Sequence, residues 1–413
     1  MSGSRYTSAI RAGAVMLGLG LATMAFGGDR EQAKRMHDRL AGVPPTEAVL
    51  SNMASLIASG THQDMVAAAE LAMDNPAFYS VTLKNFATPW TNREQSVDFP
   101  LNDYSATVIG MIRDSRDFRE VLYGDVLYTV SGSPAAFSTS DNEHYRRAED
   151  AGINLKAALT AQTQSSMLGI PTEATAGVMT SRAAAAAFFY AGTNRAMFRF
   201  TMMNHMCNDL EQLKDPTRPP DHIRQDVSRS PGGDSRVFLN NCIACHAGMD
   251  GMAGAFSHYQ YNATGGTPDD SRNRLDSGQL VYTATTVQPK YLINADNFKL
   301  GHITEDDSWI NYWRNGPNAV LDWGTYPGVD LDAKGNAVGA GAKSLGMEFA
   351  HSRMFAECQA KKVFQTVCLR EPSNDGAASG DRSAIGAMVT ALENSNFDMK
   401  TAFAEAAVYC RGE

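Results

Sequence analysis

Residues 242–246 have the sequence Cys-Ile-Ala-Cys-His, the one strong chemical motif of the chain. On a helix, positions i, i+3 and i+4 lie on one face, so both thiols and the imidazole would point the same way. Two thiols one turn apart can each bond to a heme vinyl group, and the adjacent histidine can bind the iron. The C-x-x-C-H spacing therefore predicts one covalent heme c, held by Cys242 and Cys245, with His246 as the proximal iron ligand.

Three other interpretations of this motif compete with heme attachment. A thioredoxin-type C-x-x-C pair needs a βαβ context, whereas the sequence around Cys242 has a helical character. A zinc ribbon needs a second close cysteine pair, and the sequence contains none. A structural disulfide would leave His246 without a role. Heme attachment is the favoured prediction.

The motif does not fix the sixth iron ligand. Met249 is three residues from His246 and would lie on the same side of the iron. Met347 ranks first as a distal ligand, because it opens the C-terminal helical unit, where a loop could fold it over the heme. His302 ranks second, since it follows a loop-rich segment at a separation common for distal ligands. An open sixth position is the third alternative.

The four other cysteines are Cys207, Cys358, Cys368 and Cys410, and they allow three disulfide pairings. If residues 353–368 form one helix, Cys358 and Cys368 are about 15 Å apart, too far to be bridged. Cys368 and Cys410 end the first and third of three predicted closing helices, and these ends meet in an up-down-up arrangement. We favour Cys368–Cys410 with Cys207–Cys358, against the alternative of buried free thiols.

The first 28 residues have the pattern of a secretory signal peptide. Arg5 and Arg11 precede an apolar run over residues 12–26, and two glycines follow it. A membrane-spanning helix needs roughly 20 apolar residues, so this run is short for an anchor. We expect cleavage of a Sec-type signal, a periplasmic or otherwise exported protein, and no transmembrane anchor afterwards. Export fits the heme prediction, because heme is attached to such motifs outside the cytoplasm.

Length and composition indicate a globular protein of two or three domains. The chain has 413 residues, of which 43% are hydrophobic and 20% charged, which argues against a disordered or collagen-like protein. Its 36 basic and 45 acidic residues give a net charge of −9, which becomes −11 without the two arginines of the predicted signal. This charge disfavours nucleic-acid binding and favours a redox partner protein with a basic docking face.

Helical patterns dominate the rest of the chain, so the predicted fold class is mainly α. Apolar side chains at i, i+3, i+4 and i+7 over residues 33–40 predict a first amphipathic helix. Thr46 is a good N-cap for a second helix, and residues 62–73 predict a third. The apolar run over 181–213 predicts a central buried helix that Gly192 interrupts or weakens. Three helices near 346–367, 382–394 and 399–410 close the chain, after a loop-rich region with weak strands near 280–282 and 329–338.

These patterns divide the chain into five segments. The fold is expected to be multi-helical, with a c-type cytochrome-like heme-binding unit and a loop-rich segment. The segments are a signal peptide (1–28), an N-terminal helical domain (29–130), a central helical segment with a proline-rich connector (131–235), a heme-attachment and loop-rich region (236–345) and a C-terminal three-helix unit (346–413).

Residues 40–46 have the sequence LAGVPPT, and residues 242–250 have the sequence CIACHAGMD. The first resembles the L-x-G-L-P-P-T, and the second the C-x-x-C-H-x-x-M-D, of the planctomycete-type large c-type cytochromes, which place uncharacterised domains around a single heme motif. After the motif the chain departs from that family, because Gly251 stands where the family has proline. The resemblance implies an exported heme protein and no defined reaction. Further similar stretches lie at 75–78, 177–180, 355–358 and 397–406.

These observations favour an exported monoheme c-type cytochrome that transfers electrons. One alternative is a peroxidase- or oxygenase-like heme oxidoreductase with an open sixth iron position, in which His258 or His302 acts as a distal acid-base group. The length of the chain supports this alternative, because a protein that only carries one electron needs fewer residues. The other alternative is a scaffold subunit of a cytochrome complex, which would expose apolar patches.

Overall fold

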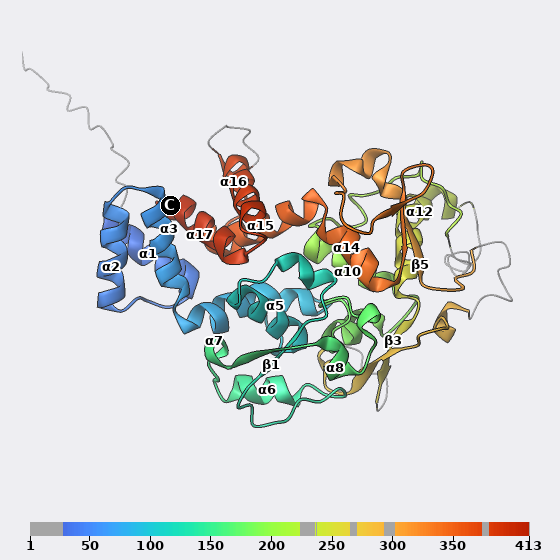
Figure 1. Ribbon diagram of the computed structural model, residues 1–413, viewed down its shortest axis with the longest axis horizontal. Coiled ribbons are helices and arrows are strands. Elements are labelled where there is room, and N and C mark those ends of the chain that lie inside the picture. The colour runs from blue at the N-terminus through green and yellow to red at the C-terminus, as the bar shows by residue number, and fades with distance from the viewer. Residues whose placement is uncertain are drawn as a thin grey trace, which may run out of the picture.

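The computed structural model of the protein describes residues 28–223, 236, 238–264, 271–292, 302–373 and 380–412. The predicted signal peptide lies outside these residues except for Gly28. The fold is mainly helical and multi-helical, as predicted. Among the described residues, no helix combines the length and apolarity that a bilayer crossing requires. The molecule is elongated, with the first helices at one end and α12 (Ile243–Ala253) at the other (Figure 1).

Three amphipathic helices build the N-terminal end: α1 (Asp29–Ala41), α2 (Glu47–Ala58) and α3 (His62–Met73). Their limits agree with the prediction, because the end signals act locally. Gly42 ends α1 in the left-handed conformation, with φ of 72°. The Thr46 hydroxyl accepts the N–H of Val49 at 3.4 Å and so caps α2. The buried faces of the three helices pack against one another.

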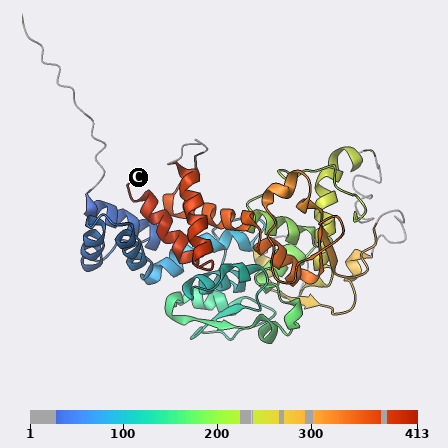
Figure 2. The same cartoon turned by 45° about the horizontal axis from the view of Figure 1, so that its top comes forward.

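The C-terminal helices return to this same end of the molecule. They are α15 (Arg353–Cys368), α16 (Asp381–Asn394) and α17 (Met399–Cys410), and α17 packs against α1 and α3. Figure 2 shows this contact, with the red α17 beside the blue helices. Arg35 and Arg39 of α1 donate to the carbonyl oxygens of Arg411 and Cys410 at 2.9 and 2.7 Å. The N-terminal helical domain and the C-terminal three-helix unit therefore pack together, within one apolar core that extends from Ala33 to Cys410.

Two of the predicted helices differ from the structure in their extent, although the predicted interruption at Gly192 is confirmed. The run over 181–213 contains α9 (Arg182–Ala184), a π turn η5 (Ala185–Phe189) and α10 (Arg195–His205). The break before α10 includes Gly192 and Asn194, which both have positive φ, 68° and 59°. The helix predicted near 346–367 is likewise two helices, α14 (Gly341–Ala350) and α15. Ser352 separates them, because its hydroxyl accepts the N–H of Phe355 and begins α15.

In the part of the chain that the structure describes, three small antiparallel sheets accompany the helices, with strand orders β1-β2, β3-β4 and β5-β7-β6. The predicted weak strands correspond to β4 and to the β6-β7 hairpin, whereas β1, β2, β3 and β5 were not predicted. The strands are β1 (Leu127–Val130), β2 (Leu159–Gln162), β3 (Tyr259–Ala263), β4 (Gly278–Tyr282), β5 (Ser308–Asn311), β6 (Asp330–Leu331) and β7 (Ala337–Ala340). The remaining α-helices are α4 (Leu83–Ala87), α5 (Asp103–Arg113), α6 (Glu143–Asp150), α7 (Leu155–Ala158), α8 (Gln164–Leu168) and α13 (Ser271–Leu275).

Two disulfides cross-link the helices, and they have the pairing that the helix ends favoured. Cys207 follows α10 and bonds to Cys358 in the middle of α15, with a Cα–Cα distance of 5.2 Å. Cys368 and Cys410, the last residues of α15 and α17, bond with a Cα–Cα distance of 5.5 Å. The closing helices are thus tied both to the centre of the molecule and to each other.

Candidate heme-attachment site

The motif lies where a π turn, η7 (Phe238–Cys242), passes into the helix α12. The helical geometry places Cys242, Cys245 and His246 on one face of the chain. These three residues are half-buried, whereas every residue from 247 to 253 is buried. The motif therefore occupies the accessible end of a helix whose other end is fixed in the core.

The helix α12 lies unusually close to β5 and to the 3-10 turn η10 (Tyr312–Arg314). A Cβ atom at Gly248 would lie 2.0 Å from Nε1 of the buried Trp313, and one at Gly251 would lie 2.9 Å from the carbonyl oxygen of Ile310. Helical periodicity puts Gly251 on the side of α12 opposite the cysteines and Gly248 on its flank, about 90° from them. Glycine at these two positions thus allows the close packing that holds α12 in place.

The two motif cysteines differ from the other four, because they form no disulfide. Burial is the main cause that raises the pKa of the Cys245 thiol, and its Sγ lies 3.5 Å from the carbonyl oxygen of Leu210. All pairings of the seven strands in the described chain are antiparallel, so these strands form no βαβ unit beside α12. This strand arrangement disfavours a thioredoxin-type pair.

A zinc site at the motif would need further ligands of its own. Within the described ranges, no group of three or more His, Cys, Asp or Glu side chains is arranged to hold a metal ion. Two thiols with an adjacent imidazole are, by contrast, the donor set that covalent heme attachment uses. The chemistry of the donors present therefore fits a heme.

The imidazole of His246 is oriented by a buried carboxylate one turn along the same helix. Its Nδ1 lies 3.2 and 3.3 Å from the two carboxylate oxygens of Asp250, whose side chain is 0% exposed. Arg195 binds that carboxylate through Nε and a terminal nitrogen at 2.7 and 2.9 Å. An acceptor at Nδ1 keeps the proton on that nitrogen and leaves Nε2 as the metal-binding atom.

Of the predicted distal ligands, His302 lies beside α12. Its backbone N–H donates to the carbonyl oxygen of Ile223 at 2.8 Å, and Ile223 packs against Ala247 of α12. The imidazole of His302 also lies against that of His222, with ring centroids 4.9 Å apart. Sequence reasoning missed His222, because nothing in its local sequence distinguishes it from a surface histidine.

Met347, the other predicted distal ligand, belongs to α14, where its carbonyl oxygen accepts a hydrogen bond from Nδ1 of His351 at 2.9 Å. The strand β5 packs against both α14 and α12. The contacts thus connect His302 to α12 through Ile223 and Met347 to α12 through β5. The order of the two distal ligands stays a prediction.

His258 follows α12 and the 3-10 turn η8 (Gly254–Phe256). Its imidazole is buried, with Nδ1 3.4 Å from a carboxylate oxygen of Asp307. The role of His258 or His302 as a distal acid-base group stays a prediction.

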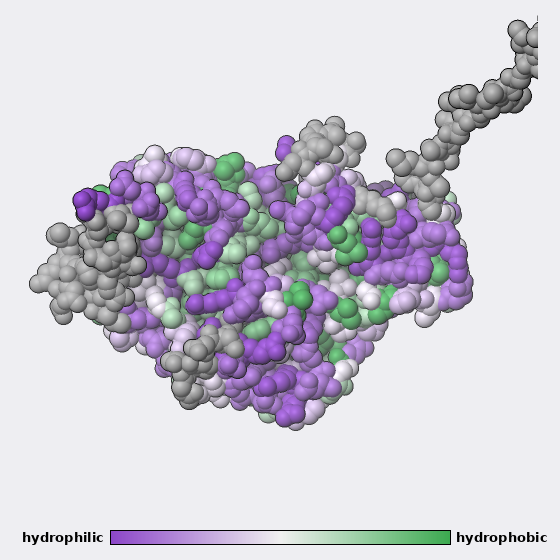
Figure 3. All heavy atoms as spheres, turned by 180° about the vertical axis from the view of Figure 1, so that it is seen from behind, coloured by the Kyte–Doolittle hydropathy of each residue, from purple (hydrophilic) through white to green (hydrophobic). Residues whose placement is uncertain are grey.

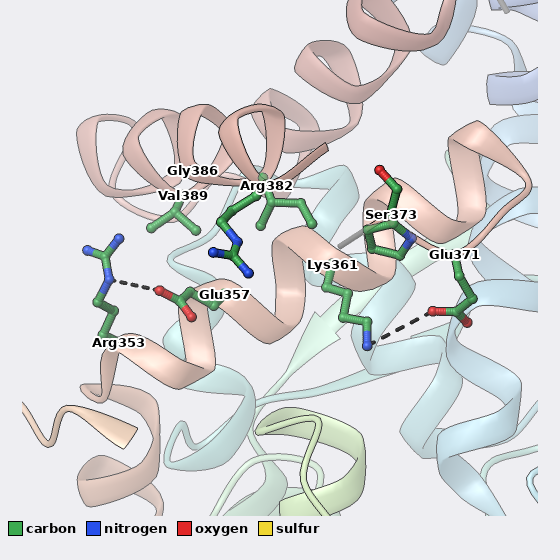
Figure 4. Close-up of a pocket in the computed structure, with 10 residues that line it drawn as sticks. Arg353, Glu357, Lys361, Glu371, Ser373, Arg382, Gly386 and Val389 are labelled. Atoms are coloured by element: carbon green, nitrogen blue, oxygen red, sulfur yellow. Dashed lines mark hydrogen bonds and ion pairs between the residues drawn. The ribbon is translucent and has the colours of Figure 1, made fainter. Parts of the chain in front are cut away.

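A separate groove of about 630 Å³ lies between α15 and α16, away from α12 (Figure 4). Arg353 pairs with Glu357 at 2.9 Å, and Lys361 lies 4.0 Å from Glu371. Arg382 also lines it. Such exposed ion pairs contribute little binding energy, and the lining offers no cysteine or histidine for covalent or metal chemistry. The motif on α12 is the better candidate for function.

Comparisons with protein-family models, with curated proteins and with solved structures find no match to this chain. The geometry around α12 is therefore the basis on which a function is assigned.

Proposed function

We propose that this protein is an exported monoheme c-type cytochrome that transfers electrons. Cys242 and Cys245 would form the thioether bonds to one heme c, and His246 would be the proximal iron ligand. The observation that carries the proposal is a contrast among the cysteines. Four pair as disulfides, while two remain as free thiols one turn apart, beside an imidazole whose Nδ1 is already bonded.

Each part of the α12 surroundings has a role in this proposal. The heme supplies one-electron chemistry through its iron. The cysteines fix the ring, His246 presents Nε2, and the close packing at Gly248 keeps their helix in place. The backbone N–H of Asp215 donates to the carbonyl oxygen of Ala244 at 2.9 Å, which ties the proline-rich connector to the motif itself.

The charge and the surface support a carrier that meets its partner transiently. A net charge of −9 for the whole chain favours a redox partner with a basic docking face, and salt should weaken that association. Figure 3 shows one face of the molecule, on which hydrophilic residues predominate and hydrophobic ones are scattered.

A heme oxidoreductase is the second candidate, and the position of His302 favours it as much as it favours a sixth ligand. Beside α12, this histidine could bind the iron or act as an acid-base group above an open position. The same test separates the two functions. We also propose that the chain belongs to the planctomycete-type large c-type cytochromes, because residues 242–250 resemble their heme motif.

The test is the visible absorption spectrum of the purified full chain, oxidised and reduced, with and without carbon monoxide. The chain is produced with a c-type heme maturation system. A low-spin spectrum that carbon monoxide leaves unchanged is expected, because protein ligands would then occupy both axial positions of the iron. A high-spin spectrum, or prompt carbon monoxide binding, would contradict the electron-carrier function and favour the oxidoreductase. His302→Ala and Met347→Ala, compared with each other and with the wild type, then identify the ligand.

A further inference from the structure

Behind the proximal histidine lies a buried polar chain that heme attachment alone does not require. It runs from Nδ1 of His246 to the carboxylate of Asp250 and on to the guanidinium of Arg195. The Asp250 side chain is 0% exposed and that of Arg195 is 21% exposed. Water therefore screens this charge pair weakly, and its electrostatic effect on the neighbouring imidazole is strong.

Contacts of the preceding residue, Asn194, hold Arg195 in this position. It is the first residue of α10, where helix dipoles favour acidic rather than basic side chains. The preceding residue, Asn194, has φ of 59°, and its amide donates to the carbonyl oxygens of Phe256 and Tyr259 at 2.6 and 2.8 Å. Lys290 donates to the Asn194 side-chain oxygen at 2.6 Å. The start of α10 is thereby fixed to the segment that follows α12.

Asp250 reaches the imidazole by helical spacing, four residues after His246. A carboxylate that accepts a hydrogen bond from Nδ1–H increases the electron donation of Nε2 to a bound iron. This donation favours the oxidised state of the iron. The guanidinium opposes this effect, because its two bonds to the carboxylate draw negative charge away from the imidazole. Two residues on different helices thus act on one ligand in opposite directions.

We infer that Asp250 and Arg195 are positioning residues that tune the reduction potential of the heme through His246. The inference rests on the proposed function and extends it, since it names what regulates the potential of that site. Asp250 fixes the orientation of the ligand and lowers the potential. Arg195 fixes the carboxylate and limits how far it lowers the potential.

The experiment compares four variants of the full chain with the wild type, each produced with heme maturation: Asp250→Asn, Asp250→Glu, Arg195→Gln and Arg199→Gln. Arg199→Gln is the matched control. Arg199 lies one turn along α10 and binds Asp209 through the same two-bond geometry, at 2.7 and 2.6 Å, on an exposed surface. The measurements are the heme content and the midpoint potential from a spectroelectrochemical titration.

Asp250→Asn should raise the potential, with about a tenfold change in the reduction equilibrium, which is about 59 mV for one electron. Arg195→Gln should lower the potential, Asp250→Glu should return it toward the wild-type value, and Arg199→Gln should leave it nearly unchanged. The opposite signs matter, because general loosening of α12 would move both variants in one direction.

The inference is overturned if heme-loaded Asp250→Asn has the wild-type potential, or if Asp250→Asn and Arg195→Gln shift it in the same direction. If Asp250→Asn does not retain heme, Arg195→Gln decides alone, and an unchanged or raised potential overturns the inference. Wild-type protein that carries no heme contradicts the proposed function instead, so the two failures are distinguishable.

Discussion

The closing helices and the motif helix hold their cysteines in opposite states. In α15 and α17, three cysteines are buried and each is bonded, to one another or to Cys207. On η7 and α12, two cysteines are half-buried and free. The cross-linked helices join both termini of the described chain in one core, whereas α12 is fixed by glycine contacts and by the Asp250–Arg195 pair.

The two regions thus differ in how accessible their cysteines are. Disulfides and apolar packing stabilise the closing helices, where the cysteines are buried. On α12 the residues 247–253 are buried, whereas the side chains of the motif are half-buried. Changes in the two regions should therefore have separable effects, on heme content in one and on the free energy of unfolding in the other.

The largest effect should follow loss of the motif thiols. Cys242→Ser with Cys245→Ser should abolish covalent heme, because no thioether bond can then form. Folding should change little, since both residues are half-buried and bind no other cysteine. Heme staining of a denaturing gel measures the first effect and circular dichroism the second. Ile243→Val, inside the same motif, is the control that should retain heme. Full covalent heme in the double variant would refute the assignment of the cysteines.

Loss of a disulfide should have the converse effect. Cys368→Ser with Cys410→Ser opens a loop of 42 residues, and loop-closure entropy gives a loss of about 4 kcal/mol. Opening the loop of 151 residues at Cys207–Cys358 should cost about 5 kcal/mol on the same basis. Urea unfolding measures both, with heme content as the accompanying readout. Heme loss at unchanged stability would show that the two regions do not differ in this way.

Acid should weaken the cross-linked region through His205 on α10. Burial lowers the pKa of His205 to about 3, and its Nε2 is bonded to the Tyr104 hydroxyl at 2.8 Å. Between about pH 6.5 and about pH 3, His205 is protonated in the unfolded chain and neutral in the folded chain. The free energy of unfolding should therefore decrease as the pH is lowered through this window, by up to about 1.4 kcal/mol per pH unit.

The measurement is urea unfolding across that range for the wild type and for His205→Gln, which keeps a hydrogen-bonding side chain. The variant should show a shallower decline. Equal slopes would assign the acid sensitivity to other groups.

The smallest effects should come from a pair of glycines. Gly248→Ala places a methyl group 2.0 Å from Trp313 Nε1, and such overpacking costs about 1–3 kcal/mol. Gly386→Ala on α16 meets no atom within 4 Å and should stabilise its helix by up to about 1 kcal/mol. Thermal unfolding compares them. An equal change in the thermal unfolding of both variants would show that α12 is not closely packed against Trp313 at Gly248.

The sequence predicted best where the controlling interactions are local. The limits of α1 and α2 follow from Gly42 and Thr46, which act within one turn of their own helices. The disulfide pairing also follows from the predicted helix ends, whereas covalent heme at residues 242–246 stays a prediction. A carboxylate four residues after His246 is visible in the sequence, but its contact with the imidazole was not predicted.

What the sequence did not predict depends on distant partners. Asn194 turns the chain with a positive φ because Phe256, Tyr259 and Lys290 bind its side chain. That turn divides the central helix and brings Arg195 to Asp250, 55 residues later. Strands of four residues, such as β5, are too short for an alternating pattern to distinguish them from loops.

The central claim is that Cys242 and Cys245 bind one heme covalently. Its most direct test is the intact mass of the acid-denatured full chain, produced with heme maturation, followed by mapping of the peptide that contains residues 242–246. Acid removes heme that is bound only through its iron, and it leaves thioether bonds intact. The account predicts a mass increase of one heme, located on that peptide. A chain of unmodified mass, or heme attached elsewhere, would contradict it.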